Sequence, residues 1–217
     1  MSATDVELLV VDSAESRDAA RGLITEYLEW IGEGAREHYG LSFDIGAMVA
    51  SDLSESSGLW PPSGRFYLVR HAGSFVGVGC LKSLSATTAE IQRMYVKPHV
   101  RGIGAGRGLL ERLLSDARAI GYRSIRLESL RFLTAAHALY RSAGFVEISP
   151  YTDNSMQDYQ PVEALEKYRA SAVFMELLLD TATGPANSSA LAGTATGGAA
   201  EPEAAPDPAR DIGSESS

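Results

Sequence analysis

The sequence predicts a single mixed α/β domain followed by a tail. Apolar residues recur with a period of two in some segments and of about 3.6 in others, which are the periods of strands and helices. The chain of 217 residues is 45% hydrophobic and 22% charged, which is typical of globular proteins. Beyond residue 180, 28 of 37 residues are Ala, Gly, Ser, Thr or Pro, too few large apolar groups to offset chain entropy. We expect a folded domain over residues 1–180 and a disordered tail over residues 181–217.

The N-terminal part of the domain is predicted to contain one strand and two helices. A short apolar run predicts a strand over residues 6–11. Apolar residues at helical spacing predict a helix over residues 16–31 and a second one over residues 43–53. Gly and Pro then interrupt regular structure at residues 58–64.

Three strands are expected next. Apolar runs at residues 66–69 and 75–81 flank the tetrapeptide at residues 71–74, whose Gly-Ser pair is typical of a hairpin turn. Alternating residues 89–96 add one more strand. The middle of the chain therefore predicts a strand meander.

The C-terminal part returns to alternating helices and strands. An apolar stripe predicts a helix over residues 109–120 that ends at Gly121, and a short strand follows around residues 125–127. A second helix is expected over residues 132–143, with Gly144 at its end. Two strands, residues 145–148 and 172–179, close the domain, with an amphipathic segment at residues 162–170 between them.

Charge and cysteine content exclude several classes of protein. The chain has 19 basic and 28 acidic residues, a net charge of −9, which disfavours nucleic acid and anionic membranes as partners. It has no run of 18 apolar residues and its first residues do not resemble a secretory signal, so we expect a cytoplasmic protein. Cys80 is the only cysteine, and the four histidines lack metal-ligand spacing. No metal site is predicted.

The segment from Met94 to Gly108 is the most informative for function. A strand leads into a loop with alternating glycines, and a helix begins directly after it. Glycine lets backbone N–H groups approach a ligand closely, and the helix N-terminus adds partial positive charge, so the segment predicts a pyrophosphate site. The nucleotide P-loop and the dinucleotide fingerprint both fail on their required residues. The pattern that fits is Arg-x-x-Gly-x-Gly, at Arg101, Gly104 and Gly106.

This loop resembles the coenzyme A loop of the GNAT superfamily of N-acetyltransferases. Residues 91–98 look like the pantetheine-binding strand of that family, and Leu139-Tyr140-Arg141-Ser142-Ala143-Gly144-Phe145 looks like its Leu-Tyr-x-x-x-Gly-Phe motif. Residues 60–64, 126–130 and 174–177 resemble a bacterial subgroup whose acceptors are largely unassigned. The resemblance implies a mixed, mostly antiparallel sheet flanked by helices, with two strands that splay apart to admit acetyl-CoA, the co-substrate.

The resemblance also implies which residues bind coenzyme A. The backbone of the strand would bond the pantetheine arm, the loop amides and arginines would hold the pyrophosphate, and a threonine near the next helix would stand where many members have Asn. These residues are Met94, Tyr95, Val96, Arg101, Gly102, Ile103, Gly104, Ala105, Gly106, Arg107 and Thr134.

Three residues are candidates for the chemistry. Tyr140 matches the family tyrosine that protonates the leaving thiolate, and a core tyrosine is the alternative. An amine nucleophile also needs a base, for which a carboxylate in an apolar cleft is suited. Glu90 matches the offset of the catalytic glutamate in histone acetyltransferases of this superfamily, and Glu128 lies on the next strand where the cleft should open. Either could instead be an ordinary strand residue.

One departure from the subgroup is an inserted segment at residues 153–171, which is either a lid over the acceptor or a surface helix. The expected activity is transfer of an acetyl group from acetyl-CoA to the amine of a small molecule, by direct attack in a ternary complex. A non-catalytic acyl-CoA-binding protein and an acetyltransferase of protein N-termini or lysines are the alternatives. Other acyl donors stay open, as do a monomer or a homodimer and the identity of the acceptor.

Overall fold

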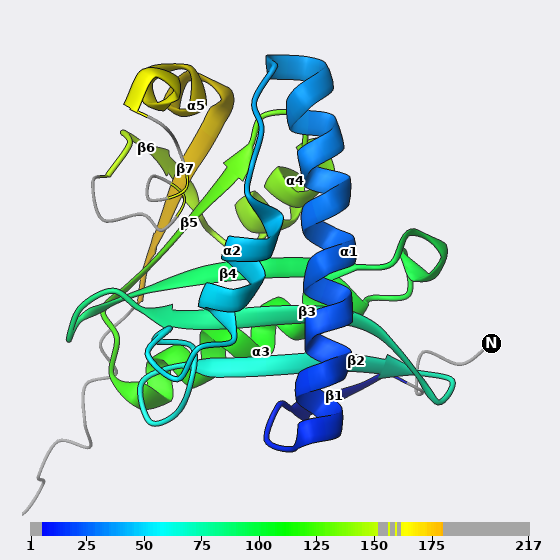
Figure 1. Cartoon of the computed structure of the whole chain (residues 1–217). Helices are drawn as coiled ribbons and strands as arrows, with labels where there is room; N and C mark the ends of the chain where they lie inside the picture. Colours follow the sequence, from blue (N-terminus) through cyan, green and yellow to red (C-terminus); the bar gives the residue numbers. More distant parts are fainter. Residues whose placement is uncertain (1–5, 152–155, 157–158, 160–161, 180–217) are drawn as a thin grey trace, which may run out of the picture. The chain divides into compact units, whose positions relative to one another are not determined.

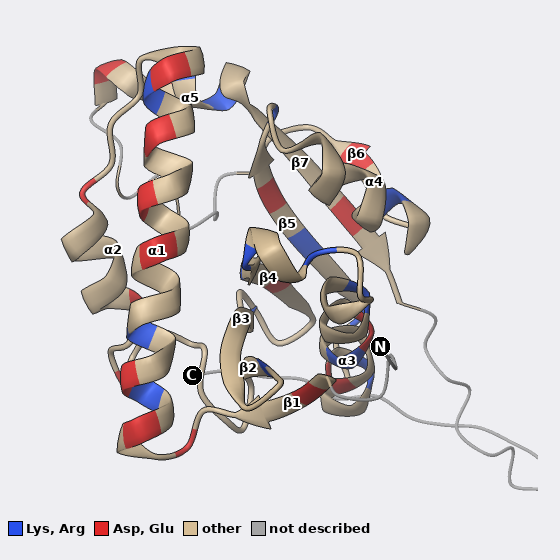
Figure 2. Ribbon diagram, turned by 90° about the vertical axis from the view of Figure 1, so that its right-hand side faces the viewer, with Lys and Arg blue, Asp and Glu red and all other residues tan. Residues whose placement is uncertain are grey.

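The computed structural model describes residues 6–151, 156, 159 and 162–179 of the chain. In this part a seven-stranded sheet has the order β1-β2-β3-β4-β5-β7-β6. Helices α1 and α2 cover one face of the sheet, and α3 and α4 cover the other (Figures 1 and 2). The strands are β1 (Val6–Val10), β2 (Arg65–His71), β3 (Ser74–Ser83), β4 (Thr88–Val96), β5 (Ser124–Leu130), β6 (Val146–Ile148) and β7 (Ala172–Leu178). The helices are α1 (Ala14–Tyr39), α2 (Ile45–Asp52), α3 (Ala105–Ile120), α4 (Thr134–Ser142) and α5 (Leu165–Ser171), with 3-10 turns η1 (Pro98–Val100) and η3 (Val162–Ala164).

The sheet pairing confirms the predicted fold class. Every described ladder is antiparallel except that between β4 and β5, which is parallel. The predicted hairpin at residues 71–74 is present, because β2 ends at His71 and β3 begins at Ser74. Ala72 and Gly73 take positive φ angles of 48° and 77°, which suit a two-residue turn.

Helix α1 is longer than the sequence pattern indicates. Its predicted end at residue 31 is wrong, because α1 continues to Tyr39 and ends at Gly40 in the left-handed conformation. Gly32 and Gly34 lower helix propensity there. At Gly34 an added Cβ would lie 2.5 Å from the ring of Phe132. The glycine is therefore explained by close packing of α1 against the loop after β5, a contact that propensity does not reveal.

The expected splay of two strands is confirmed at β4 and β5. Their parallel pairing covers three residue pairs and ends at Glu90 and Arg126. Just beyond, a β-bulge shifts the register of β4 against β3, and Arg93 takes a positive φ of 54°. The two strands then continue separately and leave a space between them.

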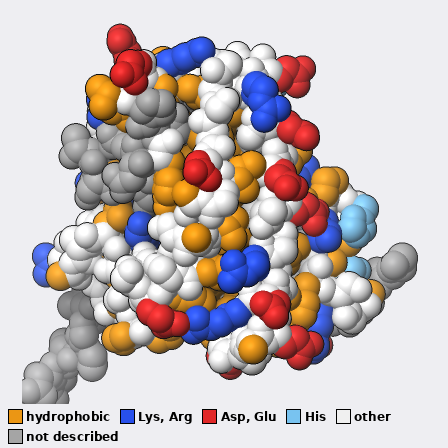
Figure 3. Space-filling model, in the orientation of Figure 1, with side chains coloured by type: hydrophobic (Ala, Val, Ile, Leu, Met, Phe, Trp, Pro, Cys, Tyr) orange, Lys and Arg blue, Asp and Glu red, His pale blue; other side chains and the backbone are white. Residues whose placement is uncertain are grey.

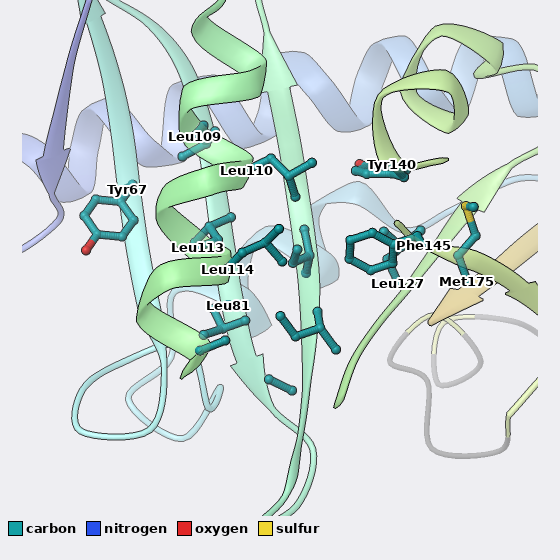
Figure 4. Packing of buried hydrophobic residues seen from close by; sticks show 14 of the residues in the cluster. Tyr67, Leu81, Leu109, Leu110, Leu113, Leu114, Leu127, Tyr140, Phe145 and Met175 are labelled. Carbon is teal, nitrogen blue, oxygen red and sulfur yellow. The ribbon is translucent and has the colours of Figure 1, made fainter. Parts of the chain in front are cut away.

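Helix α3 packs on the sheet through the apolar stripe that the sequence predicts. Leu109, Leu110 and Leu113 are at most 1% exposed, and Figure 4 shows this row lying along the strands. The helix ends at Gly121, whose φ of 102° confirms the predicted C-cap. Its N-cap is Gly104 with φ 90°, a conformation that favours glycine.

The C-terminal segments follow the predicted order. Helix α4 begins at Thr134, two residues later than predicted, and Gly144 directly after its cap has φ 96°. The predicted amphipathic segment forms η3 and α5, which leads directly into the start of β7 (Figure 1). Most of residues 153–161 and the expected tail at residues 181–217 lie outside the described residues.

The surface of this part of the chain is of mixed charge. On the face of α1 and α2, acidic and basic side chains are interspersed and separated by apolar and neutral atoms (Figure 3). Several of these charges are paired across elements, such as Arg17 with Glu55 at 2.7 Å. The net charge of −9 is therefore not expressed as one acidic patch on this face.

Candidate active site

A cavity of about 630 Å³ opens where β4 and β5 separate. Its walls come from helix α1, strands β4 and β5, the loop before α3, the start of α3 and helix α4. Met156 and Tyr168, which follow β6 in the chain, complete the walls. We call the part formed by residues 94–107 and α4 the glycine-loop half. We call the part formed by Tyr27, Arg93, Glu128, Met156 and Tyr168 the carboxylate half.

The glycine-loop half contains most of the residues predicted to bind coenzyme A. Lining residues include Met94, Tyr95, Val96, Arg101, Gly102, Gly104, Ala105, Gly106, Arg107 and Thr134. Ile103 is the one predicted residue of this group that does not line the cavity. The structure therefore brings together ten of the eleven, although what they bind stays a prediction.

The geometry of the loop suits a phosphate group. Gly104 caps α3 without any side-chain hydrogen bond, and the first helical bond runs from the Gly108 N–H to the Gly104 carbonyl. The amides of residues 105–107 precede that bond, and N–H groups of a first helical turn have no partner within the helix. A Cβ built at Gly102 or Gly104 would meet no atom within 4 Å. The loop is therefore open, and the coenzyme A pyrophosphate fits the donors present.

The two loop arginines make contacts within the protein. The Arg101 Nε donates to the Val96 carbonyl at 3.1 Å, and the guanidinium lies 5.1 Å from the centre of the Trp30 ring. The Arg107 side chain donates to the Ser142 hydroxyl at 3.4 Å. Both arginines are exposed and line the cavity, so they keep the basic character of its mouth.

Tyr140 lies on α4 with its ring largely buried and facing the cavity. It is 7% exposed and its ring centre lies 5.9 Å from that of Phe145. Figure 4 shows it beyond the leucine row of α3. Burial, with a smaller contribution from Tyr27, raises the pKa of Tyr140. The hydroxyl therefore keeps its proton at neutral pH, as a proton donor requires.

Glu128 lies on β5 beyond the point of separation and lines the cavity. Its Oε2 atom is buried and has no hydrogen-bond partner among the described residues. Burial and the nearby negative charge of Glu90 raise the pKa of Glu128 to about 8, against smaller lowering effects of Tyr168, Arg93 and the Met156 backbone. A carboxylate of this kind can accept a proton from an ammonium group near neutral pH.

Glu90, the other candidate base, lies behind the cavity wall. Its side chain is fully buried and it is not among the lining residues. The Tyr151 hydroxyl donates to its Oε1 at 2.6 Å, and the Gln92 side-chain amide donates to its Oε2. The structure thus separates the two acidic candidates, with Glu128 facing the cavity and Glu90 inside the sheet.

Sequence reasoning missed the ion pair between Arg93 of the carboxylate half and Asp52 on α2. Arg93 and Asp52 are both buried, and the Nε of Arg93 lies 2.6 Å from an oxygen of Asp52. The Nη2 atom of Arg93 donates to the other oxygen of Asp52, Oδ1, at 3.2 Å. A charged residue inside the apolar strand 89–96 was the available signal, but its partner on α2 is 41 residues away.

Sequence reasoning placed Tyr168 in the inserted segment, which is either a lid or a surface helix, but gave it no role of its own. The residue is 2% exposed, lines the cavity and lies within hydrogen-bonding range of the Glu128 carboxylate.

The described residues hold no cluster of three or more His, Cys, Asp or Glu that could bind a metal. None of the described helices is both long and apolar enough to cross a membrane.

Splayed strands, a glycine loop at a helix N-terminus and a tyrosine and a carboxylate in one cavity define the class of acyltransferases that use a coenzyme A thioester. A family model described as "Acetyltransferase (GNAT) family" matches residues 36–145, half of the sequence. The chain belongs to this family and is an acetyl-CoA-dependent N-acetyltransferase.

Two curated relatives illustrate the similarity in sequence. An "IAA acetyltransferase" of Azospirillum brasilense is 34% identical over 109 residues, which are 50% of this chain and 71% of the relative. An uncharacterized N-acetyltransferase, YjgM of Escherichia coli, is 35% identical over 115 residues, 51% of this chain and 69% of that protein.

Solved structures support the fold. The paia N-acetyltransferase of Thermoplasma acidophilum in complex with coenzyme A matches with a TM-score of 0.55 at 19% identity, over 82% of this chain and 100% of that one. The putative acetyltransferase yncA of Salmonella typhimurium with acetyl-CoA matches with a TM-score of 0.54 at 18% identity, over 84% and 98%. At these identities the likeness concerns the fold.

Proposed function

We propose that this protein transfers the acetyl group of acetyl-CoA to the amine of a small molecule, by direct attack in a complex that holds both substrates. The observation that carries the proposal is that one continuous cavity joins the glycine-loop half to Glu128. The glycine-loop half holds backbone donors for a pyrophosphate, and Glu128 has a buried oxygen that finds no hydrogen-bond partner within the described part of the chain. Two solved structures of the same fold hold coenzyme A or acetyl-CoA, which supports acetyl-CoA as the donor.

Glu128 and Tyr140 divide the proton transfers in this proposal. Glu128 accepts the proton of the attacking amine as the new C–N bond forms. Tyr140 gives its proton to the sulfur as the C–S bond breaks, so free thiol and the N-acetylated amine are the products. Water returns both side chains to their starting states. Most of the residues that line the cavity as a whole are apolar, which suits a small acceptor rather than an extended chain.

The test measures release of free thiol from acetyl-CoA over a panel of small amines. Wild-type protein should release thiol only when an amine is present, while Glu128→Gln should lower kcat/KM by roughly 100-fold or more. Tyr140→Phe should lower kcat more than it changes coenzyme A affinity. The exposed Glu147 on β6 provides the matched control, and Glu147→Gln should behave as wild type.

Two other results would redirect the proposal. Binding of coenzyme A without thiol release for any amine would support a non-catalytic acyl-CoA-binding protein. Release with peptides but not with small amines would support acetylation of protein N-termini or lysines.

A further inference from the structure

Two acidic side chains lie on the neighbouring strands β4 and β5, where the strands begin to separate. Of the two, Glu128 reaches the cavity and Glu90 does not. Glu90 belongs to the last residue pair of the parallel ladder, and Glu128 lies two positions beyond the partner of Glu90. The pair therefore consists of one acid in contact with the substrate space and one acid behind it.

The acid in the cavity is met by a residue from the inserted segment. Tyr168, on α5, is 2% exposed and its hydroxyl lies within hydrogen-bonding range of the Glu128 carboxylate. The Met156 backbone approaches the same carboxylate. Both residues line the cavity. The segment that departs from the subgroup pattern thus contacts the residue that we propose as the base.

The acid behind the wall is held by other donors. The Tyr151 hydroxyl is 2.6 Å from Glu90, and Tyr151 is itself 8% exposed. Gln92 donates to the other oxygen of Glu90. Hydrogen bonds of this kind stabilise the ionised form of a carboxylate. The Glu90 carboxylate is therefore held in a region next to Glu128 that excludes water.

We propose that Tyr168 and Glu90 are positioning residues for Glu128: Tyr168 orients its carboxylate in the cavity, and Glu90 holds a second negative charge beside it that favours proton uptake. The inference rests on the proposed role of Glu128 as the base. It gives the inserted segment a part in the chemistry, in addition to any role as a wall.

The charged and titratable groups around Glu128 act with opposite signs. A tyrosine hydroxyl that donates to the carboxylate, a guanidinium and a backbone amide favour its ionised form, whereas burial and Glu90 favour its protonated form. Among the described residues, the groups that face it are Tyr27 on α1, Glu90 and Arg93 on β4 with Asp52 on α2 paired to Arg93, Tyr151 after β6, and Tyr168 on α5.

The experiment follows protonation of Glu128 directly. Infrared difference spectra of the full chain are recorded against pH, and the carboxylic acid band that disappears in Glu128→Gln is assigned to this residue. Tyr168→Phe should raise the midpoint of that band by about one pH unit, and Glu90→Gln should lower it by a similar amount. Tyr122→Phe is the matched control, because the Tyr122 hydroxyl donates to the Ser63 carbonyl at 2.9 Å and does not line the cavity.

Kinetics give a second readout. At a pH below the midpoint, Tyr168→Phe should lower kcat/KM for the amine about tenfold while KM for acetyl-CoA stays within twofold. An unchanged midpoint in Tyr168→Phe would overturn the proposal, as would shifts of the same sign in both variants. If the buried Glu90→Gln variant does not fold, Tyr168→Phe decides alone. The infrared titration does not depend on turnover, so a lack of thiol release would contradict the proposed function and leave this test valid.

Discussion

The two halves of the cavity are built in different ways. The glycine-loop half is formed mainly by one continuous segment, residues 94–107, whose backbone supplies the donors. The carboxylate half is formed by side chains from α1, β4, β5 and α5, which are distant in sequence. The backbone N–H groups of the loop suit the pyrophosphate, which every acyl-CoA molecule contains. Side chains from several elements can instead vary with the acceptor. The difference suggests that donor binding and acceptor chemistry can be disturbed separately.

The prediction with the largest expected effect distinguishes a loss of coenzyme A binding from a loss of stability. Gly104→Glu places a carboxylate and a side chain at the cap of α3, so thermal protection by coenzyme A should be lost, with Kd rising at least roughly 100-fold. Gly121→Glu is the matched control, since Gly121 has a similar positive φ at the other end of α3 and an added Cβ there also meets open space. Both variants should lose stability, but Gly121→Glu should keep the protection. Retained protection in Gly104→Glu would remove the loop from donor binding.

The second prediction concerns the stability of the carboxylate half. Arg93→Met leaves Asp52 buried without its partner, which should lower the free energy of unfolding by about 3–5 kcal/mol. Arg70→Met is the control, because the Arg70 and Glu7 side chains are 42% and 52% exposed and such pairs contribute about 0–1 kcal/mol. Urea unfolding at neutral pH measures both. Similar losses in the two variants would show that the buried pair does not anchor this half.

The third prediction is a pH dependence that belongs to the carboxylate half. The base must be ionised, and the pKa of Glu128 is raised to about 8, so kcat/KM should rise with pH up to a midpoint near 8. Because the folded state binds this proton more tightly than the unfolded state, stability should fall as pH rises from about 5 towards 8. Glu128→Gln should reduce that slope in urea unfolding. The Kd of coenzyme A, measured by calorimetry, should change little over the same range, and a parallel change would contradict the separation of the halves.

The smallest expected effect tests the departure from the family at α4. Thr134 lines the cavity at a position near which many members have Asn. Thr134→Asn should lower the Kd of coenzyme A by about 2–10-fold, the range of one added hydrogen bond. Thr134→Val, which lacks the hydroxyl, should raise it by a similar factor if that hydroxyl contacts the donor. Calorimetric titration distinguishes these results, and equal affinities in all three proteins would show that this position does not contact the donor.

Much of the fold followed from local patterns. The hairpin at residues 71–74, the apolar stripe of α3 and its glycine cap depend on neighbouring residues, so periodicity and turn chemistry were sufficient. The end of α1 did not follow, because the helix continues through Gly32 and Gly34. Packing of Gly34 against Phe132, almost a hundred residues away, compensates for the low propensity of glycine.

For the site, sequence motifs were sufficient to indicate the family and the residues of the glycine-loop half. That half is a contiguous motif, and its chemistry depends on backbone conformations that glycine permits locally. The fold was needed to show that Glu128 faces the cavity while Glu90 is buried behind it, and that Arg93, Asp52 and Tyr168 lie around them. Burial and the electrostatic influence of neighbouring charges arise from residues brought together by folding, so no spacing along the chain could distinguish the two acids.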